Sequence, residues 1–142
     1  MVYVDEITDI PFGSADLTLF PPLGGGTPNE SGQFILCSAG EFDALITGDA
    51  DSFVEKMLVK YYDIPDIELL MVGHHGSNGS SCEEFLNAVR PELAVISVGY
   101  NSYGHPRQEV LDRLAELGAQ VHRTDEEGAV TVSVRGENVV IY

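Results

Sequence analysis

Three histidines and one aspartate stand shortly after apolar runs of the sequence. Asp49 lies two residues after the run FDALIT, the pair His74-His75 lies two residues after IELLMV, and His105 comes seven residues after LAVISV. Carboxylate and imidazole groups are good ligands for zinc, and a carboxylate also suits manganese. If the fold brings these side chains together, they predict a reaction assisted by a divalent metal.

The residues after the histidine pair add a second chemical feature. Gly76, Gly79 and the serines between 77 and 81 place flexible, donor-rich backbone before an expected helix N-terminus. Such a terminus attracts anions, phosphate included. Beside it, a metal could polarise a phosphoryl oxygen and generate hydroxide at neutral pH, while a histidine protonates the leaving oxygen. The pattern therefore favours hydrolysis of a phosphate ester.

Each of these residues also has a purely structural interpretation. Asp49 could cap the helix that follows it, His74 and His75 could be loop residues that bond backbone groups, and His105 could be an N-cap before a proline. In a parallel α/β sheet, ligands bind at the carboxyl ends of the strands. All four residues follow such strand ends, and this shared position favours a binding site over the structural interpretation. His122, in QVHRT, is interpreted as a surface histidine.

The elements that would position these residues follow from periodicity and breakers. The middle of the chain alternates continuously apolar strands with helices, the pattern of a parallel sheet covered by helices. Ser52 with Glu55, and Ser81 with Glu84, predict capping boxes at two helix starts. The fold class is therefore α/β with β hairpins at both ends. The predicted strands are 15–20, 33–39, 42–47, 67–72, 93–98, 120–124, 129–134 and 138–142, and the predicted helices are 51–62, 81–90 and 106–117.

Composition sets limits on the class of protein. The 142 residues suit one domain, and 44% of them are hydrophobic, as in globular chains. No apolar run approaches the ~20 residues that cross a bilayer, and the first ten residues lack the basic region of a signal peptide. We therefore expect a soluble piece. The spacing of Cys37 and Cys82 does not decide whether they form a disulfide.

The net charge of the chain limits which partners it can bind. Seven Lys and Arg against 23 Asp and Glu give a net charge of −16. Such a surface repels nucleic acid, because non-specific binding depends on Lys and Arg that neutralise phosphates. Work on a polyanion would need bound cations or a partner domain. The charge alone is equally explained by solubility.

Four motifs in order identify a family resemblance: TGDADS, VGHHGSNGSS, VRPELAVISVGYNSYGHP and RTDEEGAVTV. From about Leu17 onward they resemble the metallo-β-lactamase-like domain of the ComEC family, the DNA internalisation (competence) proteins of the bacterial membrane. The resemblance implies an αββα sandwich that holds two divalent metal ions, zinc or manganese. It implies that Asp49 bridges the metals, that His105 is the last metal-binding histidine, and that His74 contacts the scissile phosphate, with His75 as the alternative.

The sequence departs from the family in one large respect. The principal metal motif of this superfamily, H-x-H-x-D-H, is absent, and no histidine precedes His74. We therefore expect residues 1–142 to be the second half of the domain, with the N-terminal half missing. Metal binding by this piece should be weak or absent, the piece alone should be inactive, and an exposed sheet edge and face should favour dimerisation. Asn29 and Ser31 fall near a polar motif of the family that we interpret as structural.

Two functional hypotheses follow. The first is a phosphodiesterase of the nuclease type that degrades one DNA strand during uptake, or a related secreted hydrolase. The second is a non-catalytic docking module of a DNA-uptake membrane protein. In either case DNA and the membrane would be met through the parent protein, on the extracytoplasmic side. A nucleotide-binding Rossmann domain is excluded, because the glycines at 24–26 follow Pro-Pro in a loop and no GxGxxG follows a strand.

Overall fold

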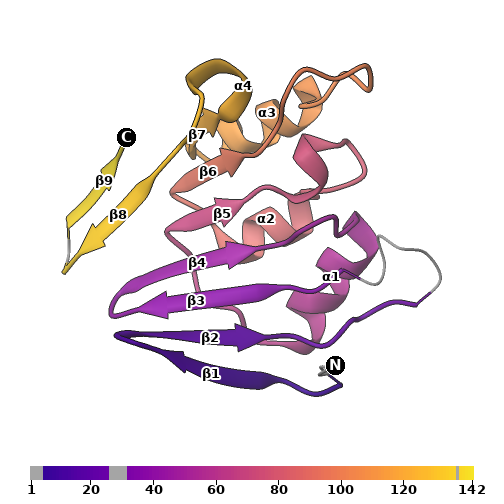
Figure 1. The fold of residues 1–142 in the computed structure, drawn as a ribbon. Helices are drawn as coiled ribbons and strands as arrows, with labels where there is room; N and C mark the ends of the chain where they lie inside the picture. Colours follow the sequence, from indigo (N-terminus) through magenta and orange to yellow (C-terminus); the bar gives the residue numbers. More distant parts are fainter. Residues whose placement is uncertain (1–4, 26–31, 137) are drawn as a thin grey trace.

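The computed structural model describes residues 5–25, 32–136 and 138–142, and all structural statements below concern these residues. A seven-stranded sheet forms the centre, and a separate two-stranded hairpin lies beside it (Figure 1). The sheet strands are β1 (Thr8–Phe12), β2 (Ala15–Leu19), β3 (Ile35–Ala39), β4 (Phe42–Ile46), β5 (Leu69–Met71), β6 (Leu93–Ile96) and β7 (Gln120–Arg123), and the hairpin consists of β8 (Val132–Arg135) and β9 (Asn138–Ile141).

The order of the strands in the large sheet follows their order along the chain, from β1 to β7. The first four strands pair antiparallel. Tight turns join β1 to β2 at Gly13 and β3 to β4 at Gly40, whose φ values are +68° and +65°. From β4 to β7 every pair is parallel, and parallel strands need a crossover connection. The carboxyl ends of β4, β5 and β6 therefore meet at one edge of the sheet.

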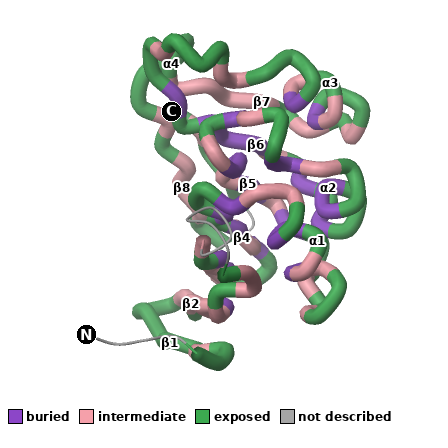
Figure 2. The backbone as a smooth tube through the Cα atoms, turned by 90° about the vertical axis from the view of Figure 1, so that its right-hand side faces the viewer, coloured by how far each residue is buried: buried purple, intermediate pink, exposed green. Residues whose placement is uncertain are grey.

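Three helices provide these crossovers and cover one face of the sheet: α1 (Ser52–Tyr61), α2 (Glu83–Val89) and α3 (Gln108–Glu116) (Figures 1 and 2). Alternate strand residues point at them, and their burial supplies the main stabilisation of the fold. The largest fully buried side chains of this core include Phe34, Leu45, Leu58, Leu70, Phe85, Ile96 and Leu114.

The opposite face of the sheet is covered only in part. Phe42, Leu69 and Val95 are buried there, packed against the valines of β8. The strand register places further residues of β1 to β4 on this same face. Toward β1 the face is uncovered, and Phe12 is 70% exposed. We call this uncovered part the open sheet face. Its residues are Ile10, Phe12, Leu17, Cys37 and Ile46.

The predicted α/β class, with a parallel centre and hairpins at both ends, is confirmed. Two elements were missed. Strand β1 contains Pro11, which an edge strand tolerates because one side of it needs no ladder partner; the other is the short helix α4 (Thr124–Glu127). Within the described ranges no helix is long and apolar enough to cross a membrane. Asn29 and Ser31 lie outside the described residues.

Both predicted capping boxes are wrong. Asp51 caps α1, with its carboxylate accepting from the backbone N–H of Phe53 and Val54. Helix α2 begins after Cys82 without a side-chain cap of its own, and Ser81 has a φ of +52°. In the predicted capping box, Glu55 would have accepted a hydrogen bond at the start of α1. Its carboxylate instead accepts from the backbone N–H groups at the start of α2.

Candidate functional site

The structure brings all four predicted site residues to one edge of the sheet. Asp49 follows β4, the 3₁₀ turn η2 (Gly73–Gly76) follows β5, and His105 lies in the loop after β6 (Figure 1). The Nε2 atom of His75 lies 4.0 Å from Oδ1 of Asp49, and the rings of His74 and His105 meet edge to face with centroids 6.1 Å apart. The carboxyl-end argument thus placed them correctly, while their roles stay predictions.

The two histidines of η2 have a rare backbone conformation. His74 has φ 50° and His75 has φ 55°, the left-handed region that residues other than glycine seldom enter. The surrounding structure holds them there: the N–H of His74 donates to the carbonyl of Gly48 (2.9 Å), and the hydroxyl of Ser80 donates to the carbonyl of Gly73 (2.8 Å). Such strain, of about 1–3 kcal/mol per residue, concentrates at functional sites.

The turn packs directly on the loop that carries His105. A Cβ atom added to Gly76 would stand 2.6 Å from Cβ of Pro106, and the φ of Gly76 is +78°. The N–H of Arg107 also donates to the carbonyl of Gly76 (2.9 Å). Only glycine allows this approach, so the position of His105 relative to the histidine pair depends on Gly76.

His75 has a defined tautomer and direction. Its Nδ1 atom lies 2.6 Å from the carbonyl oxygen of Ser97. Because a carbonyl only accepts, Nδ1 carries a proton, and Nε2 faces Asp49. A backbone carbonyl that orients the second nitrogen is also the usual support of a metal-binding histidine.

The surroundings of His105 favour its neutral imidazole form. Desolvation lowers its pKa, and Arg107, His74 and His75 lower the pKa further. Its Nδ1 atom is buried and has no hydrogen-bond partner among the described residues. The amide of Asn101 fixes the loop: it donates to the carbonyl of His105 and accepts from the backbone N–H of His105.

These donors fit a divalent metal in kind. A neutral imidazole and a carboxylate are the forms that zinc and manganese bind, and the unpartnered nitrogen of His105 and Nε2 of His75 offer lone pairs. In the described part of the chain, however, no group of three or more His, Cys, Asp or Glu side chains is close enough to hold a metal ion. The donor set therefore suits a metal but needs further ligands.

A buried carboxylate supports the loop behind the site. Glu55 on α1 is buried, and its oxygens accept from the backbone N–H of Ser81 (2.7 Å) and Cys82 (3.0 Å). Burial raises the pKa of Glu55 to about 6, although both hydrogen bonds act in the opposite direction. This role of Glu55 was not predicted from the sequence. Glu55 shares a helix face with buried Leu58, however, and that spacing was the available signal.

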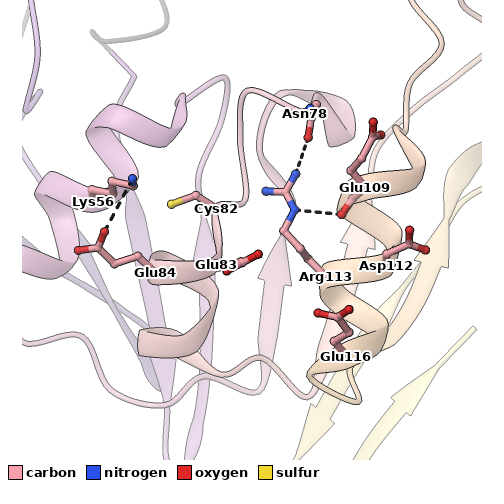
Figure 3. A pocket seen from close by; sticks show the side chains of 9 residues that line it. All are labelled: Lys56, Asn78, Cys82, Glu83, Glu84, Glu109, Asp112, Arg113 and Glu116. Atoms are coloured by element: carbon pink, nitrogen blue, oxygen red, sulfur yellow. Dashed lines mark hydrogen bonds and ion pairs between the residues drawn. The ribbon is translucent and has the colours of Figure 1, made fainter.

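Arg113 on α3 fixes the same loop from the other side. Its guanidinium donates to the carbonyls of Ser80 and Ser81. It also donates to the side chain of Asn78, as Figure 3 shows. It stands in an acidic groove of about 620 Å³ between α2 and α3, which none of the four site residues lines. The groove residues are Lys56, Asn78, Cys82, Glu83, Glu84, Glu109, Asp112, Arg113 and Glu116.

The remaining histidine and the cysteines lie outside the site. The interpretation of His122 as a surface residue is wrong: its side chain is only 13% exposed, and Nδ1 lies 2.8 Å from Oε2 of Glu127. The helix α4, which the sequence analysis missed, supplies this carboxylate and explains the difference. Cys37 and Cys82 are free thiols.

No family profile matches the chain, but it is similar to curated proteins of bacterial competence. It is 48% identical to the competence protein ComA of Neisseria gonorrhoeae over 94 residues, which are 65% of this chain and 14% of that protein. It is 36% identical to the ComE operon protein 3 of Bacillus subtilis over 113 residues, 79% of this chain and 14% of the relative. Recombination protein 2 of Haemophilus influenzae is 36% identical over 106 residues, 74% of this chain and 13% of the relative. The chain therefore spans about one seventh of the length of these relatives.

Among solved structures, the fold resembles CmlA, a diiron β-hydroxylase from Streptomyces venezuelae. The TM-score is 0.59 at 15% sequence identity, over 87% of this chain and 33% of CmlA. An E377D mutant of the same enzyme matches with a TM-score of 0.57 over 86% of this chain and 32% of the mutant. At this identity the likeness concerns the fold alone, a mixed sheet with helices packed on it.

Proposed function

We propose that this chain contributes one half of a metal-dependent phosphodiesterase domain in a ComEC-like DNA-uptake protein. The observation that carries the proposal is the convergence of Asp49, His75 and His105 at one sheet edge, beside His74. The similarity to proteins named for competence supports the biological setting. DNA would be the substrate of the parent protein, on the outer side of the cytoplasmic membrane.

Asp49 and His105 would hold zinc or manganese together with ligands from another segment. When bound, such a metal polarises a phosphoryl oxygen and lowers the pKa of water. Both proposed ligands suit it: the carboxylate of Asp49 is exposed, and the imidazole of His105 is kept neutral by its surroundings.

Between the two histidines of the turn, the contacts favour His75 as the proton donor. With Nδ1–H bonded to Ser97, its Nε2 atom can take up a proton and release it to a leaving oxygen. Its Nε2 atom faces the carboxylate of Asp49, 4.0 Å away. His74, whose ring lies against His105, would contact the phosphate.

The missing half of the domain is the proposed partner of the open sheet face. Apolar residues such as Ile10 and Phe12 are exposed there, and an apolar face of this kind gains stability when it is covered. The matched residues cover only 14% of each of these relatives, which have ample length to provide the cover. Alone, the chain would be inactive and would tend to form a homodimer through this face.

Calorimetric titration with manganese and zinc tests the proposal. We expect weak or no binding by the chain alone, and tight binding with hydrolysis of bis(p-nitrophenyl) phosphate by a longer protein that adds an H-x-H-x-D-H segment. Asp49→Ala and His105→Ala should abolish both in the longer protein, whereas His122→Gln, a matched histidine outside the site, should change neither. Tight binding by the chain alone would contradict the half-domain proposal.

A non-catalytic docking module is the second candidate, favoured by one observation. The described residues contain no group of three metal-ligating side chains. If the longer protein binds no metal and hydrolyses no phosphodiester, while the chain still associates with the remaining segment, docking is its function. A secreted hydrolase would instead cleave its substrate without any membrane-bound parent.

A further inference from the structure

The loop from Gly99 to His105, which we call the tyrosine loop, exposes two aromatic rings beside the site. Tyr100 is fully exposed and Tyr103 is 71% exposed. Tyrosine is enriched among the residues that contribute most of the binding energy at contact surfaces. Neither ring packs into the hydrophobic core, so the fold does not account for their presence.

The tyrosine loop is fixed in place by one side chain. The amide nitrogen of Asn101 donates to the carbonyls of Gly99 and His105, and its oxygen accepts from the backbone N–H of Tyr103 and His105. Four hydrogen bonds from one residue hold the loop backbone in its shape. The rings are therefore presented on a preorganised support, which lowers the entropic cost of binding a ligand.

One of the two tyrosine rings contacts the imidazoles of the candidate site. Tyr103 stacks on His105 with centroids 5.9 Å apart and an interplanar angle of 18°, and His105 meets His74 edge to face. A cavity of about 210 Å³ opens between the loop and His75. It is smaller than the ~300–1,000 Å³ of drug-sized sites, and it therefore suits a single ring system.

The charge around this cavity differs from the rest of the chain. No Asp, Glu, Lys or Arg occurs from Gly99 to His105, although the chain as a whole has a net charge of −16. Arg107 follows directly, lies under Gly104, and has no acidic partner among the described residues. Neutral rings with one nearby guanidinium fit a flat, weakly polar group that is attached to a phosphate.

We propose that Tyr100 and Tyr103 stack unpaired nucleobases of the substrate strand and so position the adjoining phosphodiester at His75 and His105. The inference rests on the proposed function for the reaction of that phosphodiester. Stacking on aromatic side chains accepts every base, because each has a π-face, and it requires the base to be free of its pairing partner. Arg107 contacts a phosphate of the same strand. The tyrosine loop thus restricts the site to single-stranded nucleic acid.

The test is an NMR titration of the 142-residue chain with thymidylyl-thymidine, which carries two bases and only one charge and so avoids the repulsion of a polyanion. Dimethyl phosphate is the base-free control. We expect saturable shifts of the Tyr100 and Tyr103 ring signals with the dinucleotide and none with dimethyl phosphate. Alanine at either position should raise the dissociation constant by roughly tenfold, and Tyr100→Phe and Tyr103→Phe should keep the affinity.

Tyr61→Ala is the matched control, because this exposed tyrosine lies on α1, outside the cavity. Equal shifts with dimethyl phosphate, equal shifts at Tyr61, or no tyrosine shift at saturating dinucleotide would each overturn the proposal. The titration needs no metal and measures no turnover. Failure of hydrolysis in the longer protein would therefore leave this result intact, and loss of stacking would leave the metal-binding result intact.

Discussion

Glu55 is an acidic residue in a fully buried position. It is a carboxylate without solvent exposure, yet both oxygens accept backbone hydrogen bonds at the start of α2. Removal from water disfavours the charged form more strongly than the two hydrogen bonds favour it, so the pKa is raised to about 6. Cys82 and Arg113 are its titratable and charged neighbours.

This raised pKa gives a pH dependence of stability with a definite sign. Below pH 4.5 Glu55 is protonated in both states; between 4.5 and about 6 the folded chain keeps the proton that the unfolded chain releases. Folding is thus favoured at the acidic end, and the contribution of Glu55 to the free energy of unfolding falls by about 2 kcal/mol as pH rises through this window. Urea denaturation at several pH values measures it.

The other carboxylates also titrate in this range, so the comparison with Glu55→Gln isolates the residue. The difference in unfolding free energy between wild type and Glu55→Gln should change across the window and stay constant above it. Glu84→Gln, on the exposed side of α2, should show no such change. A pH-independent difference for Glu55→Gln would show that the carboxylate is not desolvated.

Among the elements, the contact between η2 and the loop after β6 decides the geometry of the site. Its closest point is Gly76 against Pro106, and the neighbouring hydrogen bond from Arg107 fixes the same approach. Two loops that follow different strands are thereby held as one unit. A change at Gly76 should affect His75 and His105 together, although it alters neither.

We expect Gly76→Ala to lower the free energy of unfolding by about 2–4 kcal/mol, because it combines a left-handed φ with a clash against Pro106. The imidazole NMR signals of His75 and His105 should shift at the same time. Gly79→Ala is the control: its Cβ would meet only the Ser77 hydroxyl at 3.7 Å, and the effect should stay within about 0.5 kcal/mol. Equal losses in both variants would contradict the packing argument.

The elements also show what the sequence could predict. Apolar runs and breakers predicted the strand–helix alternation, and with it the edge where Asp49, His74, His75 and His105 gather, because strand ends follow from local pattern. The contacts of Glu55 and Arg113 join residues 26 to 35 positions apart. Local periodicity contains no information on such pairs. The capping box predicted for Ser52 and Glu55 failed for the same reason. In the folded chain the Glu55 carboxylate accepts from the distant backbone N–H groups of Ser81 and Cys82.

For the whole molecule, the unequal cover of the two sheet faces is the dominant feature. Helices bury one face, whereas the opposite face is covered only near β8, which leaves the open sheet face exposed (Figure 2). The net charge of −16 opposes self-association, and salt screens that repulsion. The balance between apolar attraction and charge repulsion should therefore shift with ionic strength.

We expect Phe12→Ser to suppress self-association of the chain at high salt, because Phe12 contributes the largest exposed ring of the open sheet face. Sedimentation velocity over a range of micromolar concentrations measures this. Tyr61→Ser removes an aromatic ring of similar exposure from α1, on the other side of the sheet, and should leave association unchanged. Association that is equal in wild type and Phe12→Ser would place the contact elsewhere.

The sequential strand order has a consequence for how the chain acquires its structure. Every strand of the large sheet pairs with the strand made just before it, so the sheet can grow in one direction. Folding of this kind can proceed during synthesis, one strand and helix at a time, without waiting for distant parts of a longer polypeptide. The order in which the ribosome delivers the strands is then also the order in which the edge with the candidate site is assembled, with Asp49 placed first and His105 last.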